Sequence, residues 1–124
     1  MKKLLYTLFV LVGMSTVGLA QDASNVAVAQ GHTELIKAKE SGVFTFEIPG
    51  DKTSEEVSDR AKFYTNYFTV AFDEGTDIVT ITMVDNSPSS RTIISRFLMS
   101  SGFRMVRVGD EELKMIDFTA QYLK

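Results

Sequence analysis

The sequence contains no cysteine, and that absence removes several classes of function at once. Disulfide bonds, thiolate metal ligands and cysteine nucleophiles all need this side chain, so none of them is available to the chain. A lipid-anchored bacterial precursor would also need a cysteine at its cleavage site. Stability must therefore come from the burial of apolar side chains, which make up 44% of the residues.

Histidine is almost as scarce, since His32 is the only one in 124 residues. A catalytic triad or a proton relay needs a histidine held beside a nucleophile by a third group, and nothing near His32 in the sequence supplies one. The acidic pairs Glu55 with Glu56 and Glu111 with Glu112 are adjacent in sequence, so they cannot flank a substrate as acid and base. No glycine-rich phosphate loop or G-x-S-x-G elbow occurs. The sequence therefore predicts a protein that is not an enzyme and uses no cofactor.

The first twenty residues, MKKLLYTLFVLVGMSTVGLA, have the layout of a secretory signal peptide. Two lysines precede an apolar run that ends near Val12, and small residues follow as far as Ala20. The run is shorter than the roughly 20 apolar residues that a membrane-spanning helix needs. We therefore predict cleavage before Gln21 and an exported protein, periplasmic or secreted. A retained membrane anchor is the alternative.

The charge of the chain limits its partners. Lysine and arginine number 13 against 16 aspartate and glutamate residues, and two of the lysines would be lost with the signal peptide. A mildly acidic domain is poorly suited to bind nucleic acid or an anionic membrane through charge alone. We therefore expect no nucleic acid partner and no membrane association after cleavage. Another protein of the cell envelope is the expected partner.

Three segments alternate between apolar and polar residues, which is typical of strands with one buried face. They cover residues 43–48, 68–72 and 79–83, and the last two flank the turn-rich sequence DEGTD, which predicts a hairpin. The stretch RMVRV predicts a fourth strand, and LKMIDF predicts a returning strand after it. The polar side of the alternation is rich in hydroxyl groups, so we expect a sheet with one covered face and one open face.

A helix is predicted to follow the first strand. Thr53 and Glu56 form a capping box at its start, and apolar residues recur at helical spacing as far as Phe68. Phe63 and Tyr67 widen this apolar stripe. A wide stripe suits a helix that packs on both a sheet and a neighbouring helix.

A second helix is predicted after the hairpin. Ser87 is a suitable N-cap, and Pro88 follows it at the first helical position. Phe97 lies at the centre of the apolar face, so its ring is expected in the core. Gly102 follows the last turn, where a left-handed residue commonly ends a helix.

The order from Val43 to Val108 is therefore strand, helix, strand, strand, helix, strand. With right-handed crossovers it predicts an α+β fold, a ferredoxin-like βαββαβ sandwich with two helices on one face of a mostly antiparallel sheet. An extra C-terminal strand is expected at one edge. Residues 21–42 are weakly patterned and are assigned to an N-terminal tether with room for one short strand or helical turn, between the signal peptide at 1–20 and the domain at 43–124. The C-terminal sequence TAQYLK is left without an assigned structure.

This pattern resembles the heavy-metal-associated domain family of small metal carriers and transporter modules. The shared features are the strand ending in EIPG, the helix containing Val57 and Ala61, the hairpin TVAFDEGTDIVTITM and the helix end SSGF before a strand. They span about residues 43–108. The resemblance implies the scaffold alone, because the metal-binding C-x-x-C motif of the family would fall at Gly50 and Thr53, which offer no soft ligand.

Two sets of candidate site residues follow from this interpretation. A non-enzymatic interaction module would use the half-polar open face of the sheet or a strand edge. The residues predicted on that face are Val43, Thr45, Thr69, Ile78, Thr80 and Thr82. The alternative is a copper-type metal carrier with atypical thioether and imidazole ligands, drawn from His32, Met99 and Met105.

Four of the five arginines lie within residues 91–107, which raises the question of an anion site. Arg91 and Arg96 would lie about 140° apart around a helix, and Arg104 and Arg107 would point to opposite faces of a strand. We interpret all four as solvated surface residues.

Overall fold

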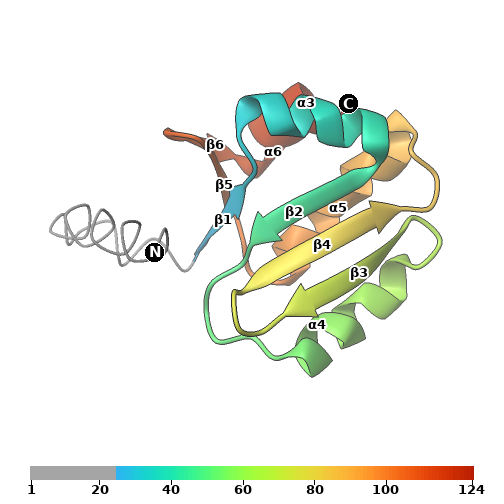
Figure 1. The fold of residues 1–124 in the computed structure, drawn as a ribbon, viewed down its shortest axis with the longest axis vertical. Helices are drawn as coiled ribbons and strands as arrows, with labels where there is room; N and C mark the ends of the chain where they lie inside the picture. The colour runs from blue at the N-terminus through green and yellow to red at the C-terminus, as the bar shows by residue number, and fades with distance from the viewer. Residues whose placement is uncertain (1–24) are drawn as a thin grey trace, which may run out of the picture.

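The computed structural model describes residues 25–124 and shows an α+β fold, in which a mixed sheet is covered by helices (Figure 1). The strands are β1 (Val26–Ala29), β2 (Val43–Glu47), β3 (Phe68–Asp73), β4 (Ile78–Met83), β5 (Met105–Val108) and β6 (Glu111–Lys114). They form one six-stranded sheet in the order β3-β4-β2-β1-β5-β6. The predicted signal peptide, residues 1–20, lies outside the described part of the chain.

The helical layer contributes to the same core as the sheet. It consists of α3 (His32–Ser41), α4 (Ser54–Ala61), the 3-10 turn η2 (Lys62–Tyr64), α5 (Pro88–Ser100), α6 (Met115–Phe118) and the π-helical turn η3 (Thr119–Leu123). Buried residues of α3, α4, α5, α6 and η3 belong to one hydrophobic cluster with the inward side chains of the strands. The helices therefore cover a single face of the sheet. Among the described helices, none is long and apolar enough to cross a membrane.

The alternation seen in the sequence corresponds to the two faces of the sheet. Phe44 and Phe46 of β2 are almost fully buried, and they lie opposite Ile81 and Val79 of β4. Phe97 of α5 has no exposed surface, which confirms its prediction as a core residue. Its ring packs edge-on against that of Phe68, with centroids 5.9 Å apart. Such aromatic pairs add to the free energy of burial.

The predicted helix boundaries at the capping residues are confirmed. The Thr53 hydroxyl accepts a hydrogen bond from the Glu56 backbone N–H, and the Glu56 carboxylate accepts one from the Thr53 N–H. Ser87 caps α5, with Pro88 in its first turn. Gly102 has φ of 101°, the left-handed region that favours glycine. These signals are local, so the sequence shows them directly.

The assignment of residues 21–42 to a tether is wrong for the part that the structure describes. β1 lies inside the sheet, antiparallel to β2 and parallel to β5, and α3 follows it. Ala27 has no exposed surface, and Ala29 pairs with Phe46, whose ring contacts Phe118. Ala27 and Ala29 leave room for large aromatic rings at this central position. Because alanine is only weakly hydrophobic, they also give a weak hydrophobic pattern in the sequence. A four-stranded ferredoxin-like sheet would place β5 directly beside β2, so the inserted strand changes the predicted order.

The C-terminal region agrees with the prediction only in part. The expected extra strand is present as β6 at the edge next to β5. It ends at Lys114, however, and the following residues turn into α6 and η3 instead of continuing as a strand. α6 and η3 pack against α5. They cover a flank of this helix that the sequence analysis predicts to be solvated.

Arg91 lies on that flank, and its interpretation as a solvated residue is wrong. Its side chain is 7% exposed. The guanidinium donates from Nε to the Leu123 carbonyl at 2.9 Å and from Nη1 to the Asn86 side-chain oxygen at 2.9 Å. Asn86 in turn donates to the Lys39 carbonyl at the end of α3, at 2.7 Å. Arg91 therefore joins the ends of α3 and η3 to the start of α5.

Candidate interaction surface

The strand face opposite the helices carries the residues that the sequence assigned to an interaction surface. The register places Thr69, Thr82 and Val43 in one row across β3, β4 and β2. Ala71, Thr80 and Thr45 form the next row. Ile78 lies one step further along β4. We call this surface the open face, and define it by Val43, Thr45, Thr69, Ala71, Ile78, Thr80 and Thr82.

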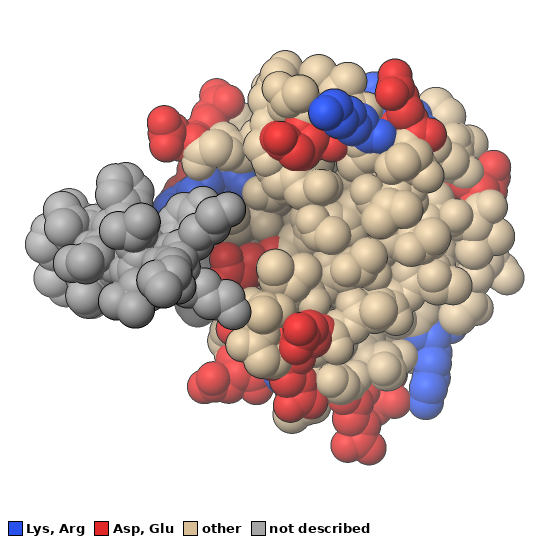
Figure 2. Space-filling model, in the orientation of Figure 1, with Lys and Arg blue, Asp and Glu red and all other residues tan. Residues whose placement is uncertain are grey.

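The open face is uncharged at its centre. Figure 2 shows it turned toward the viewer, largely tan, with acidic and basic side chains mostly around its margin. Ile78 is 40% exposed and Val43 38% exposed, large fractions for apolar side chains in the middle strands of a sheet. Threonine offers a methyl group together with a hydroxyl that both donates and accepts. This surface can therefore make apolar contacts and hydrogen bonds at the same positions.

The two ends of the open face differ in chemistry. At one end, Val84 N–H donates to the Tyr67 carbonyl at 2.9 Å, which extends the β3–β4 ladder by one pair. Tyr67 and Val84 are both exposed. At the other end, Asp73 and Glu47 lie on either side of Ile78. The surface thus runs from an apolar end, across the threonines, to an acidic end.

Sequence reasoning missed Tyr67 and Val84, which lie at the apolar end of the open face. The apolar stripe of the first helix was extended to Phe68, which absorbed Tyr67 into the helix. In the structure α4 ends at Ala61 and the 3-10 turn η2 follows it, so Tyr67 lies beyond both and directly before β3. The sequence does contain a signal for this position, because Tyr67 is two residues before Thr69 and residues two apart in a strand share a face.

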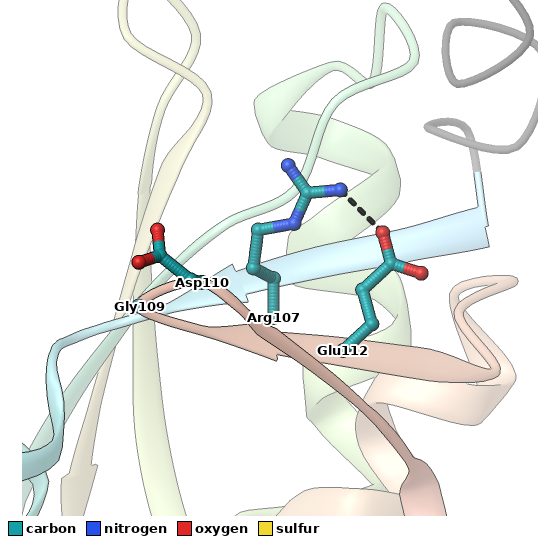
Figure 3. Close-up of a pocket in the computed structure, with 4 residues that line it drawn as sticks. All are labelled: Arg107, Gly109, Asp110 and Glu112. Carbon is teal, nitrogen blue, oxygen red and sulfur yellow. Dashed lines mark hydrogen bonds and ion pairs between the residues drawn. The ribbon is translucent and has the colours of Figure 1, made fainter.

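A shallow depression lies at the hairpin of β5 and β6, lined by Arg107, Gly109, Asp110 and Glu112 (Figure 3). Arg107 forms an ion pair with Glu112 on the paired strand. The Asp110 side chain points away from this pair. Because Arg107, the basic residue of this depression, is already paired with the Glu112 carboxylate, the depression offers no strong anion site.

The structure does not bring together the three candidate metal ligands. Met99 is exposed on α5, above the covered face. Met105 lies on β5, where its neighbour Val106 points into the core, so Met105 belongs to the opposite face. His32 contacts Tyr122 instead, with Nδ1 and the phenol oxygen 2.9 Å apart. Within residues 25–124, no group of three or more histidine, aspartate or glutamate side chains could hold a metal ion.

The loop that the sequence pattern predicts to match the metal loop of heavy-metal-associated domains starts a helix in the structure. Thr53 N–H donates to the Glu56 carboxylate at 3.0 Å, and the Thr53 hydroxyl accepts from the Glu56 N–H at 3.1 Å. The carboxylate accepts from the Thr53 backbone N–H and also from the Thr53 hydroxyl, at 3.3 Å, and these two hydrogen bonds hold the pKa of the Glu56 carboxyl below its ordinary value of 4.5. Gly50, the other position predicted to match a family cysteine, has φ of 116°. Any side chain there would be strained.

Comparison with known proteins yields no relative: no family model, no curated protein and no solved structure matches the chain. The resemblance to heavy-metal-associated domains therefore stays a prediction from the sequence pattern. The function has to be argued from the surface itself.

Proposed function

We propose that the chain is an exported, non-enzymatic binding module whose open face docks another protein of the cell envelope. The scaffold is a cysteine-free variant of the ferredoxin-like sandwich of heavy-metal-associated domains, with β1 inserted between β2 and β5. The observation that carries the proposal is a bare sheet face with an uncharged, threonine-rich centre. Partner binding is assigned to Thr45, Thr69, Ile78, Thr80 and Thr82.

The composition of the open face matches the centre of a protein interface. Charged residues are depleted at interface centres, and a polar rim surrounds them. None of the residues that define the open face is charged, whereas Asp73 and Glu47 lie at its acidic end. A surface kept only for solubility would gain from charged side chains at these exposed strand positions. Their absence from the defined open face favours a contact role.

A protein suits this surface better than a nucleic acid or a lipid bilayer. Nucleic acids and anionic membranes attract clustered lysine and arginine, which the open face lacks. The acidic end formed by Asp73 and Glu47 would repel a phosphate backbone. We therefore propose a partner surface that is uncharged at its centre and carries basic side chains opposite this acidic end.

Site-specific cross-linking in the producing cells tests the proposal. A photoreactive residue at Thr80 should give one protein adduct, whereas the same residue at Ser58, on the exposed side of α4, should not. The adduct partner is then purified, and its affinity for the chain is measured by calorimetry. Thr80→Lys should reduce that affinity at least about tenfold, because a desolvated charge would lie at the interface centre. Equal adducts at both positions, or an unchanged affinity of Thr80→Lys, would refute the proposal.

Export is tested separately, because it concerns residues outside the described part of the chain. The intact mass of protein isolated from the producing cells should correspond to a chain that starts at or near Gln21. A mature chain that retains Met1 in a membrane fraction would contradict export by a cleaved signal peptide.

A further inference from the structure

The two edges of the sheet are protected to different degrees. β6 is four residues long and carries Glu111, Glu112 and Lys114, the kind of short, charged strand that discourages pairing with another chain. β3 is six residues long, and no charge occurs from Phe68 to Phe72. It contains no proline. α4 packs beside β3 (Figure 1), but the strand lacks both the short length and the charges that protect β6. Long, uncharged edge strands are templates for pairing with a further strand.

The backbone groups of β3 that face outward can be identified from the register. Val84 N–H donates to Tyr67, while Met83 N–H donates to Gly42 ahead of β2, so successive residues of β4 bond to opposite neighbours. By this alternation Thr69 and Ala71 direct their backbone groups toward β4. Phe68, Val70 and Phe72 direct theirs to the free edge. In the described part of the chain, no hydrogen bond to the outward groups of these three residues is formed.

The sequence of this edge is complementary to itself. Read from either end, Phe68–Phe72 gives aromatic, small, valine, small, aromatic. An antiparallel pair with Val70 on the twofold axis would set Phe68 opposite Phe72 and Thr69 opposite Ala71. Each residue with outward backbone groups then meets another one, so both its N–H and its C=O are satisfied. Side chains of the covered face also stay on the covered face.

We propose that a second copy of this chain pairs with β3 through this register and forms a twofold symmetric dimer. A C2 interface uses the same patch on both copies, and a strand that reads alike in both directions meets that requirement. The pairing sets no charged residue of Phe68–Phe72 against another, so it adds no like-charge repulsion between two acidic chains. Val70 and Phe72, only half-buried in one copy, would gain cover from the other.

The dimer does not depend on the proposed function, since it uses the edge of β3 and leaves the centre of the open face exposed. Its effect on that function would be geometric. Two open faces would become one continuous surface across both sheets, because edge pairing keeps the faces in register.

Sedimentation measurements on the purified protein test the dimer. The chain should sediment as a dimer at the upper end of a range from about 1 µM to about 1 mM. In the Thr69→Lys, Ala71→Lys variant, each new charge lies opposite another across the axis, and the dissociation constant should rise about tenfold or more. Both side chains are exposed, so the fold of one copy should survive. A monomer throughout the range, or a variant that dimerises like the parent, would overturn the proposal.

Two further variants separate pairing from misfolding and from face contacts. Mixing the lysine variant with a Thr69→Glu, Ala71→Glu variant should restore a dimer, because opposite charges then face each other. Failure of the mixture to associate would contradict the register. A Thr80→Lys, Thr82→Lys variant alters the adjacent strand without touching the edge, and it should dimerise like the parent. Loss of its dimer would place the contact on the open face instead.

Discussion

Alternate residues of β2 meet two different environments, and the pair Thr45 and Phe46 shows the contrast within one dipeptide. Phe46 lies under the helical layer with 1% of its surface exposed, against the ring of Phe118. Thr45 lies half-buried on the open face, in a row with Thr80. The covered face therefore supplies the stability of the domain, while the open face is left free for contacts with other molecules.

The largest effect is expected on the covered face. Phe46→Ala should lower the free energy of unfolding by about 3 to 5 kcal/mol, since it removes a buried ring and leaves a cavity between β2 and α6. Its neighbour Thr45→Ala is the matched control and should cost less than about 1 kcal/mol. Urea unfolding of both variants beside the parent gives the two values. Equal losses would mean that the two faces do not differ in their contribution to stability.

A smaller effect is expected in the helical layer, where a charged residue lies among apolar ones. Arg91→Met should cost about 1 to 3 kcal/mol, because the buried Leu123 carbonyl loses its donor. Arg96→Met on the same helix is the matched control, since Arg96 is exposed and should change stability by less than about 0.5 kcal/mol. The measurement is again the urea midpoint. If both substitutions have the same small effect, Arg91 does not join the C-terminal turn to the core.

The smallest effect belongs to the exposed start of α4, away from both faces. The pKa of Glu56 is lowered in the folded protein, mainly by its hydrogen bonds with Thr53. Its charge therefore stabilises the fold at pH values above the ordinary 4.5, and that stabilisation is lost as the pH falls through the lowered pKa. Glu56→Gln keeps a side-chain acceptor without the charge. The difference in stability between parent and variant should shrink on acidification below pH 4.5, whereas a constant difference from neutral pH to pH 3 would contradict the assignment.

Sequence patterns were reliable wherever the cause is local. The capping box of Thr53 and the N-cap at Ser87 depend on side chains within one turn, and both are found in the structure. The alternation in β2, β3 and β4 depends on which face each residue presents, and this too was read correctly. The sequence pattern therefore predicts the residues at the centre of the open face.

The errors lie where distant segments meet. β1 carries a weak signal because its side chains are short, and its place beside β5 is decided by pairing across almost eighty residues. Arg91 was interpreted as a solvated residue because no sequence pattern indicates that α6 and η3 cover its helix. Tyr67 was assigned to a helix because helical and strand patterns overlap at Phe68.

By itself, the sequence determined the strands β2, β3 and β4, the starts of α4 and α5, and that one face of the sheet carries threonines. These properties follow from side-chain periodicity and from hydrogen bonds within a few residues. Only the tertiary structure decided the order of the strands, the burial of Arg91 and the position of the long, uncharged strand β3 at an edge. The neighbours of each strand depend on the packing of the whole core, in which many long-range contacts compete. The total free energy of these contacts cannot be read from any local sequence pattern.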